Sequence, residues 1–352
     1  MAINITSPAN LLVKDMTSGI FSYEFFKNLK AFSEARVIGT GEENIFNLNY
    51  ESLEPYQGQF EDRAILQNIP GLATKRDYAN GGNSANILTM SSRNDDGVRC
   101  MVKMGPVDLG EDAGRVAIMS KERLVQHFAE QCALEFKAYL QQFLFGSASA
   151  AIQGMTGAAH TYNDWMATGK AATNYLTTSA LGACRQALLD RAGKYIGQGK
   201  GLWVFPSQCE YDLASSQVTG NIYQIVRDVV TSGAPMTYGA PFFTLDDLTT
   251  QSGTSPATKN VVLGLGEGLA NIKIKEPQFY IEDQRLEYET VVNFLRADCE
   301  FSIQLVGFAY NKTAGGANPD LATITTGSNW TPNYIDHREV HGVVGLFNSS
   351  LN

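Results

Sequence analysis

Hydrophobic side chains recur every three or four positions along one stretch in the middle of the chain, residues 120–146. The recurring positions are Val125, Phe128, Cys132, Phe136, Tyr139 or Leu140, and Phe143. This spacing predicts an amphipathic helix, because residues three and four apart share one helical face. Ser120 is a suitable N-cap and Gly146 a suitable stop. About 25 residues rising ~1.5 Å each give a rod of roughly 37 Å, which we expect to act as a spine.

The pattern after this helix predicts a unit of mixed helices and strands, residues 179–280. It opens with a helix at 179–192, because apolar residues again share one helical face. Those residues are Leu181, Cys184, Leu188 and Ala192. Leu202–Phe205 is then a continuous apolar run closed by Pro206, which favours a buried strand. Residues 236–274 contain further short alternating or apolar runs between turn residues, so we expect mostly strands there.

The remainder of the chain either alternates between apolar and polar residues or is mostly polar. Phe301, Ile303 and Leu305 point one way in a predicted strand from Cys299 to Val306. Residues 311–340 are polar and indicate loops. A final short strand is expected at 343–347.

Residues 45–105 predict strands and loops with few large apolar clusters. Asn80-Gly81 is a strong turn signal. Asp96-Gly97 lies between two β-prone runs, 87–90 and 98–102, which favours a hairpin. A long hairpin with so little apolar surface cannot bury much of itself, so we expect it to project from a domain.

Composition narrows the functional classes. The chain has 352 residues, a net charge of −9 and 18% charged residues. An acidic chain lacks the electrostatic footprint of a protein that reads DNA. The five cysteines are odd in number and widely spaced, which argues against a disulfide framework and a zinc site. No basic and apolar leader precedes the first element, and no apolar run approaches the ~18–20 residues of a membrane span.

The order of these elements resembles the major capsid proteins of tailed phages with the Hong Kong 97 fold. That α+β family has an N-terminal arm, an extended β-hairpin loop, a long spine helix, and peripheral and apical domains. The resemblance maps the arm to 1–44, the extended loop to 45–105 and the apical domain to 179–280. It assigns the peripheral domain to 106–178, with the spine helix at 120–146, and to 281–352.

Local strings carry the resemblance further. Those quoted are Val102-Lys103-Met104-Gly105-Pro106-Val107, Leu202-Trp203-Val204-Phe205-Pro206-Ser207, Gly239-Ala240-Pro241 with Val261-Val262-Leu263-Gly264, Gly307-Phe308-Ala309-Tyr310-Asn311, and Thr326-Gly327-Ser328-Asn329-Trp330. Their order and spacing together are similar to the family.

The resemblance implies a virion shell protein that forms hexamers and pentamers of an icosahedral head. It implies assembly in the host bacterial cytoplasm with a scaffolding protein and a portal. Contact with packaged double-stranded DNA would be weak and non-specific, and no membrane is involved. Inter-subunit contact is expected in the extended loop, at Asn80, Gly81, Asp96 and Gly97.

The sequence contains only weak motifs for catalysis or for binding a cofactor or a metal. Gly264-Leu265-Gly266-Glu267-Gly268 could suggest a nucleotide loop, but an alternating strand pattern follows where a helix is required, so a β turn is favoured. His337 and His341 lie four apart, but no third ligand is close and Pro332 opposes a long helix, so a solvated tail is favoured. We therefore expect no catalytic residue, no cofactor and no metal.

Two other classes stay open. A soluble α+β enzyme or binding module with an unrecognised pocket would form a small defined oligomer. A phage tail or baseplate protein would form rings or tubes. Lys75 or Lys103 could in principle donate a crosslink to a neighbouring subunit, but solvated or ion-paired lysines are favoured.

Overall fold

The structure is a computed structural model of the whole chain. It describes Tyr23 and residues 37–41, 43–48, 62–66, 92–108, 121–153, 162–164, 178–192, 196–197, 200–207, 236–237, 240–245, 249–251, 258–285, 291–316, 319–332 and 343–348. Most of the expected arm at 1–44 and most of the expected extended loop lie outside these residues.

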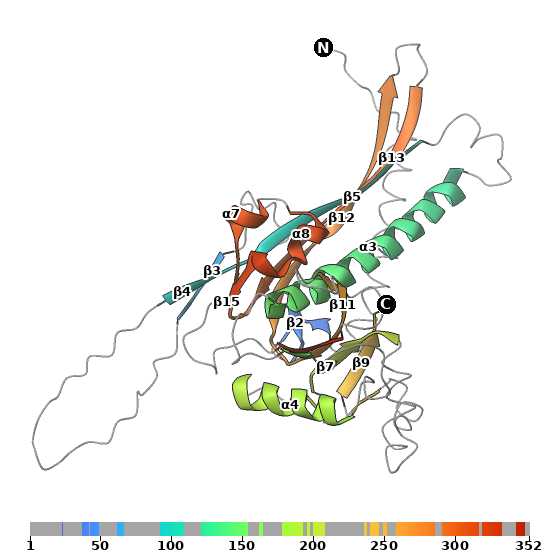
Figure 1. Cartoon of the computed structure of the whole chain (residues 1–352). Coiled ribbons are helices and arrows are strands. Elements are labelled where there is room, and N and C mark those ends of the chain that lie inside the picture. The colour runs from blue at the N-terminus through green and yellow to red at the C-terminus, as the bar shows by residue number, and fades with distance from the viewer. Residues whose placement is uncertain are drawn as a thin grey trace, which may run out of the picture.

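The largest feature is a five-stranded sheet that contains a long ribbon. Its strand order is β1 (Ile38–Gly39), β2 (Phe46–Leu48), β12 (Ala270–Arg285), β13 (Val291–Leu305) and β5 (Val98–Asp108). β12 and β13 pair antiparallel from Ala270 opposite Leu305 to Arg285 opposite Val291. β5 pairs antiparallel with the other side of β13. These three strands run as a twisted ribbon from the body of the molecule (Figure 1).

The predicted spine helix is confirmed, but its predicted end is wrong. Helix α3 spans Lys121–Gln153, 33 residues, and runs through Gly146. Gly146 has a packing role instead, since a Cβ there would lie 2.5 Å from Cγ2 of Thr325. The hydroxyl of the next residue, Ser147, donates to the carbonyl of Phe143 at 2.5 Å, so it is satisfied inside the helix. The glycine therefore allows close approach of another segment and does not stop the helix.

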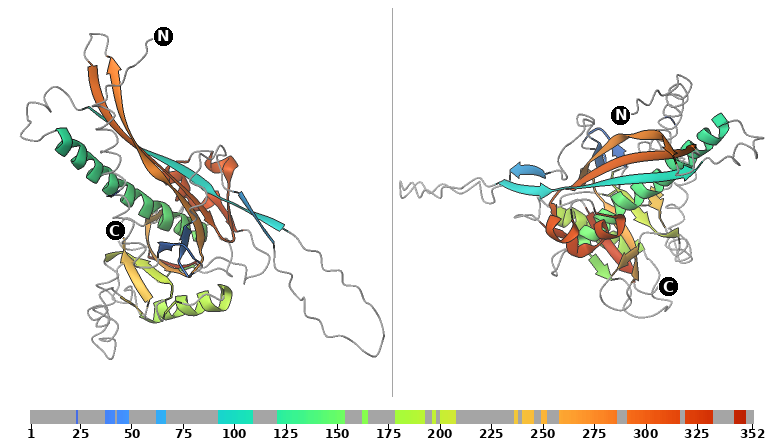
Figure 2. Two further views of the ribbon diagram at one scale, coloured as in Figure 1. Left: turned by 180° about the vertical axis from the view of Figure 1, so that it is seen from behind. Right: turned by 90° about the horizontal axis from the view of Figure 1, so that it is seen from above.

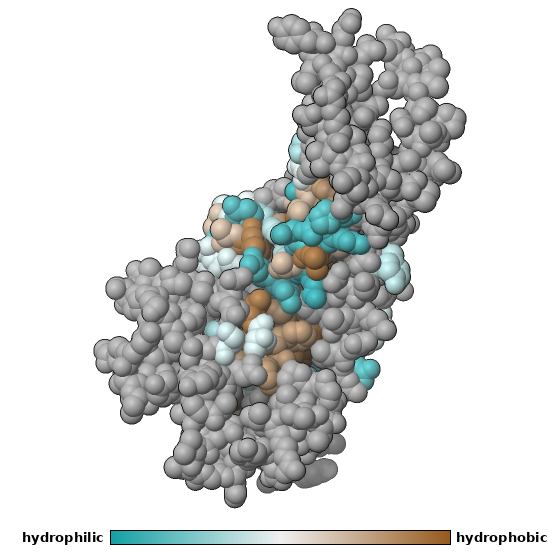
Figure 3. All heavy atoms as spheres, turned by 90° about the vertical axis from the view of Figure 1, so that its right-hand side faces the viewer, coloured by the Kyte–Doolittle hydropathy of each residue, from teal (hydrophilic) through white to brown (hydrophobic). Residues whose placement is uncertain are grey.

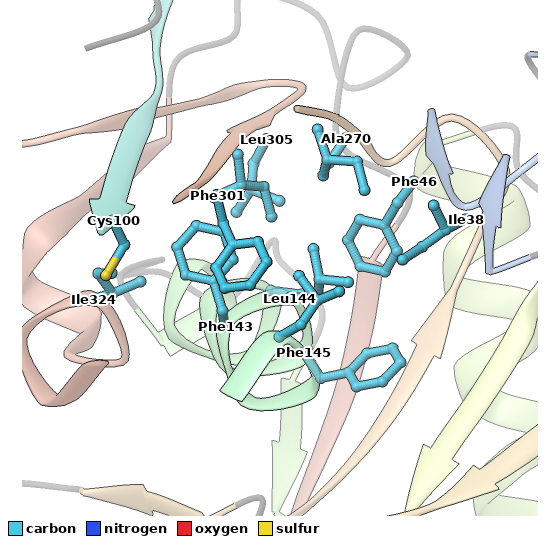
Figure 4. Packing of buried hydrophobic residues seen from close by; sticks show 14 of the residues in the cluster. Ile38, Phe46, Cys100, Phe143, Leu144, Phe145, Ala270, Phe301, Leu305 and Ile324 are labelled. Carbon is cyan, nitrogen blue, oxygen red and sulfur yellow. The ribbon is translucent and has the colours of Figure 1, made fainter. Parts of the chain in front are cut away.

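The core lies between α3 and the ribbon. Figure 4 shows Phe143 against Phe301 and Phe145 below Phe46. Ring centroids are 6.1 Å apart in the first pair. They are 5.9 Å apart between Phe46 and Phe145, which meet edge to face. Burying one such side chain contributes roughly 1.5–3 kcal/mol, so this cluster fixes the helix on the sheet. Both views in Figure 2 show α3 alongside the ribbon.

A second, seven-stranded sheet forms the other end of the molecule. Its strand order is β6 (Tyr162–Asp164), β16 (Val343–Asn348), β11 (Thr258–Leu265), β7 (Leu202–Phe205), β9 (Ala240–Thr244) and β8 (Met236–Thr237), with β10 (Thr249–Gln251) on β11. The predicted strands at 202–205 and 343–347 are confirmed, and every residue of β7 is buried. The predicted helix at 179–192 is confirmed as α4 (Thr178–Ala192), with Leu181, Cys184 and Leu188 buried.

The strand pairings of the two sheets join residues from both sides of residue 280. β12 crosses it and belongs to the ribbon. β16, expected in the peripheral domain, pairs antiparallel with β11 of the expected apical unit. The reason is that strand partners are chosen by long-range packing, which a linear division of the chain does not contain.

The prediction of a polar loop after residue 310 is wrong for residues 311–332. The strand β14 (Phe308–Tyr310) lies just before this segment. The segment itself contains α7 (Lys312–Gly315), α8 (Leu321–Ile324), the 3-10 helix η2 (Gly327–Asn329) and β15 (Trp330–Pro332). Asn311 caps α7 through Oδ1, and Asp320 caps α8. The indole N–H of buried Trp330 donates to the carbonyl of Ile324 at 2.8 Å. Capped single turns hold the segment together where longer periodic patterns are lacking.

The hairpin predicted at Asp96-Gly97 is also wrong. β4 (Ser92–Asp96) pairs with β3 (Asp62–Leu66), whereas β5 begins at Val98 and pairs with β13. The chain therefore passes from one ladder to another at Gly97. In contrast, the β turn favoured at 264–268 is confirmed, because β11 ends at Leu265 and β12 begins at Ala270 after a turn.

Candidate functional site

The ribbon has two chemically different faces, and β5 shows the division most clearly. Cys100 and Val102 are buried toward α3. Met101 and Lys103 alternate with them and are exposed, and the Met101 side chain is 55% exposed. Since successive strand residues point to opposite faces, Arg99, Met101 and Lys103 share the face turned away from the core.

β13 continues this outward face. Ala297, Cys299, Phe301, Ile303 and Leu305 are its buried apolar residues. The residues between them are polar, namely Arg296, Asp298, Glu300, Ser302 and Gln304. The strand register places Ser302 opposite both Arg99 on β5 and Lys273 on β12. The outward face is therefore a three-stranded polar ladder with Met101 near its exposed margin.

Ion pairs organise the ladder. Arg99 on β5 pairs with Glu300 on β13. Arg296 donates from Nε to Oδ1 of Asp298 at 2.9 Å along the same strand. The basic side chains are the more exposed member of each pair, at 18% and 25% against 9% for Glu300 and 15% for Asp298. The cationic groups therefore project furthest to solvent.

Two interruptions flank β13 at a similar level of the ribbon. The β12–β13 register shifts between Lys275 and Gln278, around Pro277. The β13–β5 register shifts between Leu295 and Ala297, opposite Gly105 and Pro106. Proline cannot donate to a strand ladder, so it is found at bulges and edges. Both pairings of β13 are regular from Glu300 to Ile303.

The predicted contact residues fall in two groups. Asn80 and Gly81 lie outside the described residues. Asp96 is half-buried at the end of β4, and Gly97 is buried between β4 and β5. Contact of these four residues with another subunit remains a prediction. The β3–β4 ladder that ends at Asp96 lies away from α4 and from the far end of the ribbon (Figures 1 and 2).

Sequence reasoning missed the outward face of β5 and β13. Its signal was present in the alternation of polar and apolar residues from Arg296 to Leu305. That alternation was used only to assign the strand and its apolar face. The polar half of the same pattern marks a second face, on which Glu300, Ser302 and Gln304 are buried while Arg296 and Asp298 are partly exposed.

The buried thiols offer little reactivity. Cys100 lies 3.0 Å from the hydroxyl of Tyr139 and donates to the carbonyl of Pro319 at 3.4 Å. Burial raises its pKa, and burial raises the pKa of Cys132 to about 12. The reactive thiolate is therefore scarce near neutral pH at both positions. Cys100 instead links β5, α3 and the segment before α8.

The side of the molecule that carries α3 is mixed in polarity. Figure 3 shows hydrophilic residues gathered over the middle of this side, with hydrophobic ones beside them. Among the exposed positions of α3 are His127, Gln131 and Glu135, together with Leu134 at 51% exposure. Within the part of the chain that the structure describes, no three His, Cys, Asp or Glu side chains gather as metal ligands. None of the described helices is long and apolar enough to span a membrane.

A family model decides the wider assignment. The model of the major capsid protein 13-like family matches residues 50–344, most of the chain. The chain belongs to the major capsid protein 13-like family. It is therefore a phage capsid protein, and the expected role in the virion shell is confirmed. No curated protein matches the chain.

Solved structures agree with the capsid family. The capsid of Ralstonia phage GP4 is similar over 91% of both chains, with 11% identity and a TM-score of 0.59. The capsid of cyanophage Pam1 covers 89% of this chain and 91% of its own, with 11% identity and a TM-score of 0.59. The head of Helicobacter pylori bacteriophage KHP40 covers 89% and 90%, with 9% identity and a TM-score of 0.53.

At such low identity the likeness is one of fold. Together with the family match, it confirms the Hong Kong 97-type capsid fold and the tailed-phage resemblance that the sequence suggested. The boundaries of the arm, the extended loop and the two domains stay predictions.

Proposed function

We propose that this capsid protein assembles as hexamers and pentamers into an icosahedral head that encloses double-stranded DNA. The observation that carries the proposal is the likeness in fold to the capsids of two phages over about nine-tenths of the chain. Assembly takes place in the host bacterial cytoplasm with a scaffolding protein and a portal as partners. The protein acts as a structural subunit without catalytic activity.

Contact with DNA is weak and non-specific in this proposal. Affinity for nucleic acid rests mainly on neutralising phosphates with Lys and Arg. The chain instead has a net charge of −9. A wall of this charge encloses packed DNA without holding it tightly.

The extended loop reaches a neighbouring subunit. Support comes from its base, since β3 and β4 form their own two-stranded sheet apart from the two large ones. A two-stranded ladder is marginal alone and gains stability from a further surface. Asn80, Gly81, Asp96 and Gly97 are the expected contact positions.

The deciding experiment is electron microscopy of the overexpressed chain, with and without its phage scaffolding protein, beside size-exclusion chromatography. Closed shells built from rings of six and five support the proposal. A stable monomer or dimer under all conditions overturns the proposed assembly into hexamers and pentamers. Tubes or isolated rings overturn the proposed icosahedral head.

A deletion variant tests the role of the extended loop by itself. Residues 68–90 are replaced by a short Gly/Ser linker, which keeps β3 and β4 intact. The expected result is a folded, soluble subunit that does not close shells. Shells of normal size from this variant would remove the role given to the loop.

A further inference from the structure

The outward face of the ribbon has an apolar residue where the surroundings are charged. Met101 is 55% exposed, yet its strand neighbours on the same face are Arg99 and Lys103. Opposite it in the register lies Glu300, with Ser302 and Asp298 on either side. An exposed apolar side chain flanked by charged ones is a suitable anchor for a protein contact.

The polar part of this face is well ordered. Glu300 pairs with Arg99, Asp298 pairs with Arg296, and Asn271 donates to Gln304 at 3.2 Å. A side chain held by ion pairs loses little further freedom when a partner docks. The hydroxyl of Ser302 is buried among these groups and has no hydrogen-bond partner in the described structure. The face is therefore preorganised, whereas the Ser302 hydroxyl is buried and is not open to a docking partner.

Charge selects the kind of partner. The face presents four basic residues, Arg99, Lys103, Lys273 and Arg296, against the two carboxylates of Asp298 and Glu300. The chain as a whole carries −9, so its other surfaces are strongly acidic on balance. Another copy of the same chain is thus complementary in charge to this face. DNA phosphates fit less well, because the carboxylates lie within the ladder and Met101 stands at its margin.

We propose that the outward face of β5 and β13, with Met101 exposed between Arg99 and Lys103 on its edge strand, docks an acidic segment of a second copy of this chain. The proposal rests on the proposed function only in naming the same chain as partner. It adds the surface and the chemistry of the contact. Neighbouring copies bury Met101 and bring a carboxylate close to Arg99, Lys103 or Lys273.

Photocrosslinking tests the surface directly. A p-benzoyl-phenylalanine replaces Met101 in the full chain, and a matched variant replaces Leu134 on α3, which is 51% exposed. Both proteins are irradiated after assembly and examined by denaturing gels and mass spectrometry. The expected result is a covalent dimer from position 101, joined to a peptide that carries Asp or Glu, and at least tenfold less from position 134.

The outcomes separate this inference from the shell assignment. Closed shells without any dimer from position 101 overturn the docking surface and leave the head assembly intact. Copies that crosslink at position 101 without closing shells support the surface and overturn the icosahedral assembly. A nuclease-sensitive adduct at position 101 overturns the proposal in favour of nucleic acid. Equal dimer yields from positions 101 and 134 overturn it as well.

A charged substitution gives an independent measure. Met101→Glu places a carboxylate in the proposed contact, and Leu134→Glu makes the same change at a matched exposure on α3. We expect Met101→Glu to lower the assembled fraction about thirtyfold or more, as for loss of a contact centre, with native circular dichroism. Leu134→Glu should assemble normally. Normal assembly of a folded Met101→Glu protein would refute the proposal.

Discussion

The two faces of the β5–β13 ribbon differ although they are built from alternate residues of the same strands. Toward α3, Phe301 and Ile303 are closed off by the spine helix within one chain. Away from it, Arg99 and Glu300 form an ion pair beside exposed Met101. The inner face holds the subunit together, whereas the outer face contributes little apolar burial to folding. Alternation thus separates folding from assembly along a single strand.

The largest expected effect comes from the inner face. Phe301→Ala should lower the free energy of unfolding by about 3–5 kcal/mol, because a fully buried ring is lost from the contact with α3. Met101→Ala lies on the outer face of the same sheet and should change the free energy of unfolding by no more than about 0.5 kcal/mol. Urea unfolding followed by circular dichroism measures both. Similar losses for the two variants would contradict the division between the faces.

The next effect tests how closely the tail segment approaches the spine helix. In an exposed helix interior, Gly→Ala stabilises by about 1 kcal/mol. At Gly146 the new Cβ would instead meet Cγ2 of Thr325, so we expect a loss of about 1–3 kcal/mol.

The same position supplies its own control. Thr325→Ser removes the obstructing methyl group but keeps the hydroxyl that donates to the carbonyl of Leu321 at 2.9 Å. Gly146→Ala combined with Thr325→Ser should therefore recover most of the loss in thermal or urea unfolding. A single Gly146→Ala variant that is more stable than the parent would show that the contact is loose.

A smaller effect is expected for the ion pair of the outer face. Glu300→Gln should lower the free energy of unfolding by about 1–2 kcal/mol, because the Arg99 guanidinium loses its carboxylate partner. The loss is limited because part of the guanidinium stays solvated. A double-mutant cycle with Arg99→Met measures the coupling. No coupling between the two positions would mean that this ion pair does not contribute to folding.

The smallest effect concerns acid. The side-chain and backbone hydrogen bonds from Thr323 hold the pKa of Asp320 below its ordinary value. Because the pKa of this carboxyl is lower in the folded protein, its ionisation stabilises the fold at pH values above the unfolded pKa, which is near 4. This contribution is lost as the pH falls through the folded pKa. Asp320→Asn keeps the cap without a titrating group, so its Tm should fall less than that of the parent between pH 5 and pH 3. Parallel Tm curves would contradict this account.

Long regular elements were predictable from the sequence, and long-range pairings were not. α3, α4 and β7 were found because periodicity or an apolar run reports local burial. Gly146 was misinterpreted because the helix stop rule is local, whereas Thr325 approaches it from 179 positions along the chain. The hairpin at Asp96-Gly97 failed for the same reason, since the partner of β5 is β13.

The candidate surface was only half visible in the sequence. The strand from Cys299 to Val306 was predicted from its apolar residues, and this prediction is confirmed within β13. The strand register decides which polar residues of β5 lie beside those of β13. The register becomes known only from the fold. Met101 therefore looked like an ordinary strand residue until its neighbours were placed.

The position of β16 also determines when the second sheet can be completed during synthesis. This strand lies between β6 and β11 in the second sheet, parallel to one and antiparallel to the other. Its residues, 343–348, leave the ribosome after all the strands that surround them. Translation adds residues one by one and domains fold as units. The place between β6 and β11 therefore stays open until synthesis has passed residue 348, and a nascent chain cannot present the finished subunit to its neighbours.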